Sequence, residues 1–112
     1  MSHFLYAIGP VRPQGEESQL IKIGHTNNIE RRLIALQVGC PIALTLKKSW
    51  RFARRASVID LEKHCHARFI AERKHGEWFD VTLEAVSEFV DQHSAHRGKH
   101  YSITMDEFLM RA

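Results

Sequence analysis

The carboxylate of Glu62 is the feature of this 112-residue sequence that most directly suggests chemistry. Residues 53–73 carry apolar side chains, among them Val58, Leu61 and Cys65, at intervals of three and four, which predicts an amphipathic helix. At about 100° per residue, Glu62 falls inside the apolar arc of that helix. A carboxylate there is costly to desolvate unless a cation compensates its charge. Glu62 is therefore either a metal ligand or one half of a structural salt bridge with an arginine.

Three other side chains have the chemistry to complete a site for an anionic substrate. Arg32 flanks the apolar stripe of a shorter predicted helix, where it is partly buried and either pairs with Glu62 or clamps a phosphate with its planar fork. Tyr6 and Lys22 lie on two short apolar segments that are typical of strands. If both point to one face, the ammonium lowers the pKa of the phenol and favours a general base. The alternative is an ordinary cross-strand pair.

These side chains must be positioned by a small set of alternating elements. The loop at 9–19 joins two short strands, which are expected to pair antiparallel. The order of elements is strand, strand, helix, strand, helix, then a short strand and a helix, so the expected class is α+β. The expected elements are strands at 4–8, 20–24 and 42–50, a helix capped by Asn27 or Asn28 and ended by Gly39 and Pro41, the helix at 53–73, an extended piece within 74–82, and a helix at 83–92.

Composition places the chain among soluble intracellular proteins. Its hydrophobic content is 44% and its charged content 26%, while the net charge of +3 permits an anionic partner such as nucleic acid. Cys40 and Cys65 form no C-x-x-C pair, which favours a reducing cytoplasm. We see neither a signal peptide nor a membrane span and expect a cytoplasmic protein. Residues 1–95 are expected to form one domain, and 96–112 an extension with a short helix that packs on this domain or on a second copy in a homodimer.

Two further groups of residues have competing interpretations. A basic cluster interleaved with Trp50 and Phe52 could bind DNA phosphates through counterion release, or could be a solvated helix entrance. A set of histidines with Cys65 could hold zinc, although the spacing matches no common zinc motif. The basic residues are Lys47, Lys48, Arg51, Arg54 and Arg55, and the histidines are His64, His66 and His75.

Taken in order, the motifs resemble those of the GIY-YIG nuclease superfamily. "FLY" at 4–6 stands in the position of the first tripeptide and "KIG" at 22–24 in that of the second. Arg32 follows at the place of the catalytic arginine of the family, and "LEKHCHARF" carries Glu62 at the place of its metal-binding glutamate. "GEWF" at 76–79 is similar to a motif of a phage- and bacteria-associated branch. The similarity covers residues 4–81.

The resemblance implies a central three-stranded antiparallel sheet flanked by helices, and Mg²⁺-dependent hydrolysis of a DNA phosphodiester, with Mn²⁺ as a substitute. It implies that Glu62 holds the metal and that Tyr6, assisted by Lys22, activates or positions water. Arg32 would hold the scissile phosphate.

Two histidines are additional candidates in this scheme. His66 would contact either a ligand of the metal or the phosphate, and His25 would be another proton acceptor. The sequence departs from the family at Lys22, where the family usually has tyrosine, and this departure supports a second hypothesis. In that hypothesis the chain is a nucleic-acid-binding module that keeps the fold but does not cut.

Overall fold

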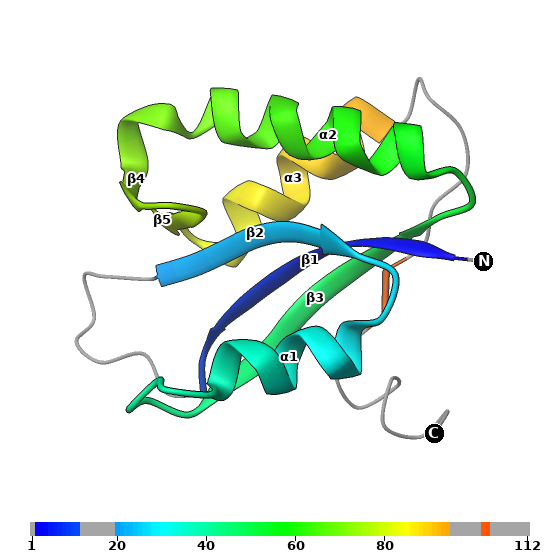
Figure 1. The fold of residues 1–112 in the computed structure, drawn as a ribbon. Helices are drawn as coiled ribbons and strands as arrows, with labels where there is room; N and C mark the ends of the chain where they lie inside the picture. Colours follow the sequence, from blue (N-terminus) through cyan, green and yellow to red (C-terminus); the bar gives the residue numbers. More distant parts are fainter. Residues whose placement is uncertain (1, 12–19, 95–101, 104–112) are drawn as a thin grey trace.

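The structure is a computed structural model that describes residues 2–11, 20–94 and 102–103. Six strands form one antiparallel sheet in the order β4-β5-β2-β1-β3-β6. The elements are β1 (His3–Pro10), β2 (Leu20–Thr26), α1 (Ile29–Gln37), β3 (Leu44–Phe52), α2 (Arg55–Arg68), the 3₁₀ turn η1 (Ile70–Glu72), β4 (Arg73–His75), β5 (Trp78–Asp80), α3 (Leu83–Ser94) and β6 (Ser102–Ile103). Helix α1 lies against one face of the sheet, and α2 and α3 lie against the other (Figure 1).

The expected α+β class is confirmed, but the sheet is larger than three strands. The extended piece around "GEWF" is a hairpin, β4–β5, that turns at Gly76 with φ +57 and pairs with the edge of β2. A two-residue strand, β6, pairs with β3 where a polar connector is expected. The helix expected at 53–73 ends earlier, because the backbone leaves the α-helical region at Phe69 and continues as the 3₁₀ turn.

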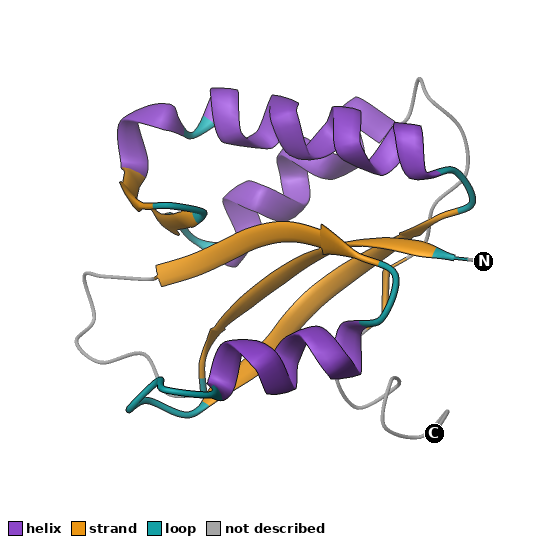
Figure 2. Cartoon of the chain, in the orientation of Figure 1, coloured by secondary structure: helices purple, strands orange, loops and turns teal. Residues whose placement is uncertain are grey.

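The side chain of Asn28 caps the N-terminus of α1. The carboxamide oxygen of Asn28 accepts a hydrogen bond from the backbone N–H of Arg31 at 2.9 Å, which confirms the expected cap. The loop that leads from β2 into α1 is short (Figure 2). The loop is short enough to hold Arg32, in the first turn of α1, close to the end of β2.

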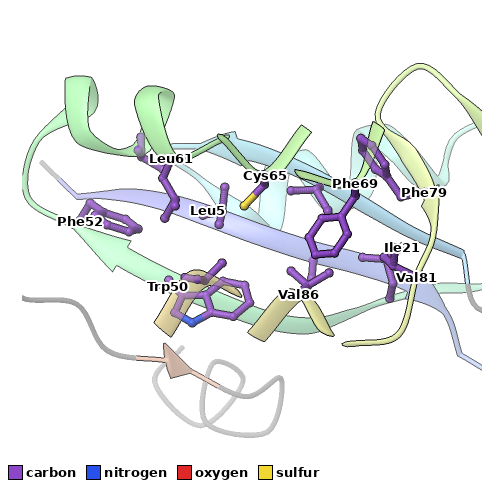
Figure 3. Close-up of a cluster of buried hydrophobic side chains, with 14 residues drawn as sticks. Leu5, Ile21, Trp50, Phe52, Leu61, Cys65, Phe69, Phe79, Val81 and Val86 are labelled. Carbon is purple, nitrogen blue, oxygen red and sulfur yellow. The ribbon is translucent and has the colours of Figure 1, made fainter. Parts of the chain in front are cut away.

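Alternation along β1 divides the core in two. Leu5 and Ala7 point toward α2 and α3, while Tyr6 and Ile8 point toward α1. The first cluster is the larger, and Figure 3 shows Leu61, Cys65 and Phe69 reaching down to the sheet. The second has four fully buried members, Tyr6, Ile8, Ile29 and Leu46. The fold is therefore held mainly by the α2/α3 layer.

The remaining predictions from the sequence concern the two cysteines, membrane-spanning helices and the C-terminus. Cys40 and Cys65 are both free thiols. Among the residues that the structure describes, no helix is long and apolar enough to cross a membrane. The helical turn expected at 104–112 lies outside the described residues, as does all of the 96–112 extension expected to contact a second copy except 102–103.

Candidate functional site

The pairing of β1 with β2 brings the first two candidate residues together. Tyr6 lies opposite Gly24, and Ile8 lies opposite Lys22, so Tyr6 and Lys22 are diagonal neighbours on the α1 face of the sheet. The expectation that a phenol and an ammonium share one sheet face is thus confirmed. Both are shielded, because Tyr6 is 1% exposed and the Lys22 side chain 14%.

Gly24 is required here by close approach. A Cβ at this position would lie 2.6 Å from Cζ of Tyr6 and 3.0 Å from Oε1 of Glu77. The first distance is shorter than a carbon atom tolerates and the second is tight, so the phenol of Tyr6 can close over the backbone here because the residue is a glycine. The glycine of "KIG" therefore serves the site as well as the strand.

Helix α2 brings Glu62 to the same end of β2. Its Oε2 lies 2.5 Å from Nδ1 of His25, and the Glu62 side chain is 15% exposed. The partial burial expected from the helical pattern is confirmed. The arginine partner is not observed: His25 occupies that place, and its signal in the sequence was its position directly after "KIG".

Glu77 is a site residue that the sequence did not reveal. It follows the turn glycine of the β4–β5 hairpin, and its backbone carbonyl accepts a hydrogen bond from the N–H of Ile23 at 3.1 Å. Its Oε1 lies 3.5 Å from Nζ of Lys22. The glutamate of "GEWF" was visible as part of the motif, but only the pairing of β5 with β2 places it beside Lys22.

Glu62, His66 and Glu77 form a group with the chemistry of a metal site. One ligand atom from each lies within 4.8 Å of the others. Nε2 of His66 lies 2.9 Å from the carbonyl oxygen of Ile23 and must donate, because a carbonyl only accepts. The lone pair of His66 is thereby left on Nδ1, the tautomer control seen in metal-binding histidines.

The charges of this group favour a cation. Two carboxylates brought this close repel each other, and a divalent ion relieves that repulsion. Oxygen donors are those that Mg²⁺ and Mn²⁺ prefer, and one imidazole is compatible with Mn²⁺ in particular. The residues present therefore fit the implied metal, with Glu77 and His66 added to the expected ligand Glu62.

The protonation state of Tyr6 differs from the expectation. Burial raises the pKa of its phenol well above 10, the nearby charge of Glu77 raises it further, and the charge of Arg32 opposes the rise. The prediction that Lys22 lowers the pKa of Tyr6 is therefore wrong, because desolvation of the phenol outweighs the effect of the neighbouring cations. Tyr6 is held as a neutral phenol.

Arg32 is positioned differently from the expectation. The prediction that its guanidinium is partly buried is wrong, because Arg32 is exposed on α1. Its charge nevertheless acts on the phenol of Tyr6, so it lies on the site's side of the helix. An exposed guanidinium at the mouth of a polar cluster is available to a phosphate from solution.

The basic cluster does not form one patch. Lys48 points toward α3, where its Nζ contacts Oγ of Ser87 at 2.5 Å and lies 5.3 Å from the ring centre of Trp50. Trp50 and Phe52, which lie between these basic residues in the sequence, are buried in the core and are not available to nucleic-acid bases. Within the cluster, Lys47 is half-buried, and the exposed members are Arg51, Arg54 and Arg55.

The four candidate zinc ligands are likewise separated. Cys65 is buried in the core, which raises the pKa of its thiol to about 12. His75 is exposed on β4, His66 belongs with Glu62, and His64 belongs with Asp60 and His93. A zinc site built from these four residues is therefore wrong.

The fold and the site together define a small α+β domain with a polar, carboxylate-rich centre at the end of its second strand. The chain belongs to the T5orf172 domain family, whose profile matches residues 3–94. This phage-associated domain is found in some nuclease-like proteins, and the match spans every residue of the centre described above. The GIY-YIG profile itself gives no direct match. No curated protein and no solved structure matches the chain.

Proposed function

We propose that this chain is a metal-dependent endonuclease that hydrolyses DNA phosphodiester bonds through a centre of the GIY-YIG type. The observation that carries the proposal is that Glu77 links groups from three elements. Its Oε1 lies beside Gly24 and Lys22 of β2, and the phenol of Tyr6 from β1 closes over the same glycine. Glu62 of α2 offers a ligand atom within 4.8 Å of Glu77. Membership of a nuclease-associated domain family supports it. Each group has a separate task in phosphodiester hydrolysis.

The metal would be held by Glu62, Glu77 and His66. When bound there, Mg²⁺ or Mn²⁺ supplies charge neutralisation at the phosphate and acidifies bound water. The carboxylates also bind the surrounding basic groups, since Glu62 contacts His25 and Glu77 contacts Lys22. The ammonium of Lys22 and the hydrogen bond that His25 donates to Glu62 limit the repulsion between the two carboxylates.

His25 is better suited than Tyr6 to accept the proton of the attacking water. With its Nδ1 proton directed to Glu62, the imidazole keeps a lone pair on Nε2 and is fixed in orientation. Histidine is the side chain that most often acts as a general base, whereas the raised pKa of Tyr6 opposes phenolate formation. The neutral phenol of Tyr6 instead donates a hydrogen bond that positions water or phosphate.

Arg32 and Lys22 would bind the phosphate. Arg32 is exposed and offers two parallel N–H donors to phosphate oxygens. Lys22 is held against Glu77 and over the ring of Trp78, whose centre is 5.7 Å from Nζ. A cation fixed in this way stabilises developing negative charge without first having to be ordered.

A second candidate is a DNA-binding module that does not cut. The observation that favours it is the neutral state of Tyr6 together with a lysine in the second tripeptide, which removes one phenol from the centre. Such a module would bind DNA in a salt-dependent manner that is indifferent to Mg²⁺.

Incubation of supercoiled plasmid and branched DNA with the purified chain and Mg²⁺ or Mn²⁺ distinguishes the two. We expect nicking by the wild type, loss with Glu62→Gln and Arg32→Ala, and wild-type nicking with the control Glu88→Gln, an exposed glutamate on α3. Cleavage that is equal in wild type and Glu62→Gln, or absent from the wild type on every substrate, would contradict the nuclease proposal.

A further inference from the structure

A second acid–histidine group lies on α2, on the side turned away from Glu62. Asp60 and His64 are about 160° and 200° around the helix from Glu62, and they face His93 of α3. One ligand atom from each of the three residues lies within 4.8 Å of the others. None of these three residues has a task in the proposed phosphodiester chemistry.

The imidazole of His64 is held in place by its own helix. Its Nδ1 lies 2.7 Å from the backbone oxygen of Asp60, which can only accept, so Nδ1 carries the proton. The same nitrogen lies 3.6 Å from the Asp60 carboxylate. The Nε2 lone pair is therefore available to a metal, and a carbonyl acceptor behind the ring is the arrangement that orients metal-bound histidines.

The imidazole of His93 is held by aromatic contacts. Its ring stacks on Phe89 with centroids 5.7 Å apart and meets the ring of His64 at 4.6 Å. Phe89 in turn contacts Phe69 edge-on at 5.9 Å. Both imidazoles are thus pre-oriented beside one carboxylate, which lowers the entropic cost of collecting them around an ion.

We propose that Asp60, His64 and His93 form a zinc site that joins α2 to the C-terminal end of α3. Two imidazoles and one carboxylate are the donor set of a late transition metal, and Zn²⁺ binds them at about 2.0–2.2 Å. Tetrahedral ligands at that distance stand about 3.3 Å apart, so binding needs only a modest contraction of the present group. The fourth position remains for water.

This site differs from the Glu62 centre in metal preference. Two carboxylates with one imidazole suit a hard, oxygen-seeking ion, whereas two imidazoles with one carboxylate suit zinc. The proposal is independent of nuclease activity, because it concerns the contact between two helices. A bound ion would stabilise the packing of the end of α3 against α2.

The test is titration of tag-free, metal-stripped protein with ZnCl₂, followed by calorimetry and by thermal unfolding. We expect one zinc per chain in the wild type and an increase in Tm of roughly 5 °C or more with zinc in large excess over Kd. His64→Ala should lose far more affinity than the roughly 10–100-fold that loss of an outer-shell partner costs. His64 is exposed, so this variant is expected to fold.

Three further variants separate this site from the Glu62 centre. His93→Ala should abolish the same binding event, while His66→Ala and the control His75→Ala should retain it. Visible absorption of Co²⁺ in place of Zn²⁺ reports the ligand set without any activity measurement. Wild-type protein that binds no zinc, or zinc binding that survives His64→Ala and is lost in His66→Ala, would overturn the proposal.

Discussion

Helix α2 carries the same local pair twice, an acid followed four residues later by a histidine, and the two pairs face different neighbours. Glu62 and His66 face the end of β2, where Glu77 and Lys22 complete a polar centre. Asp60 and His64 face α3, where the third group is His93.

The comparison shows that chemistry is decided by what the tertiary structure places opposite a pair. Glu62 is the more enclosed acid, with 15% of its side chain exposed against 38% for Asp60. An enclosed carboxylate beside a second carboxylate has a greater need for a compensating cation. This difference is consistent with the two proposals, hydrolysis at the first pair and a zinc link between helices at the second.

The largest expected effect is on cleavage. Glu62→Gln keeps the size of the side chain but removes its charge, so the cleavage rate should fall at least about 100-fold. Zinc binding at Asp60, His64 and His93 should be unchanged in the same variant. A gel-based cleavage assay and a zinc titration on one preparation check both, and loss of zinc binding as well would show that the two groups are not separate.

The second effect is a loss of stability at alkaline pH, and it arises from Cys65, which lies on the core stripe of the same helix. The folded thiol has its pKa raised from 9.0 to about 12 by burial, so above pH 9 the unfolded chain releases a proton that the folded chain keeps. The free energy of unfolding should be constant below pH 9 on this account and fall by about 1.4 kcal/mol per pH unit toward pH 12.

Cys65→Ala is the control for this pH dependence. It leaves a small cavity that lowers stability at every pH, but it should remove the contribution of the thiol to the slope between pH 9 and 12. Tyr6, whose raised pKa adds to the decline above pH 10, would remain. Denaturant unfolding across this range is the measurement, and an unchanged slope in Cys65→Ala would contradict the burial effect.

The third effect concerns Gly24. Gly24→Ala places a methyl group against the phenol of Tyr6 and the carboxylate of Glu77, so we expect a loss of about 1–3 kcal/mol in stability and a loss of cleavage. Gly76→Ala is a matched comparison, because Gly76 has φ +57 and no atom within 4 Å of its added Cβ. It should show backbone strain of about 1 kcal/mol with cleavage retained. Equal effects on cleavage would argue against close packing at Gly24.

The smallest effect compares the two histidines of α2 without metal. His66→Ala removes a hydrogen bond to Ile23 and a ring contact with Phe79 at 5.0 Å, so stability should fall by about 1–2 kcal/mol. His64→Ala, at an exposed position, should cost no more than about 0.5 kcal/mol in zinc-free buffer. Urea unfolding of both variants measures the difference. A larger loss of stability in His64→Ala than in His66→Ala would contradict the view that His66 is the more tightly packed of the two.

Much of the fold could be predicted from local patterns. The strands of β1 and β2, the cap at Asn28 and the three helices all have periodic or capping signals in the sequence. The β4–β5 hairpin and the early end of α2 could not be predicted, because each depends on pairing and packing with distant segments. Strands of three residues are too short for a periodic signal.

The site was predictable where a residue type was out of place in its pattern. Glu62, Tyr6 and Lys22 were found in this way. Tyr6 and Lys22 are neighbours on the sheet, and Glu62 lies near them through Glu77. Glu77 was not found, because its relevance arises only through β5. The predicted direction of the pKa shift of Tyr6 was wrong. A neighbouring cation can be seen in the sequence, whereas desolvation depends on the complete packing.

The most direct test of the central claim is the single-turnover cleavage rate of end-labelled DNA as a function of Mg²⁺ concentration, for wild type and Glu62→Gln. We expect a saturable, Mg²⁺-dependent rate in the wild type and a rate near background in Glu62→Gln at all concentrations, with Glu88→Gln equal to the wild type. A rate that is independent of Mg²⁺, or the same in wild type and Glu62→Gln, would contradict it.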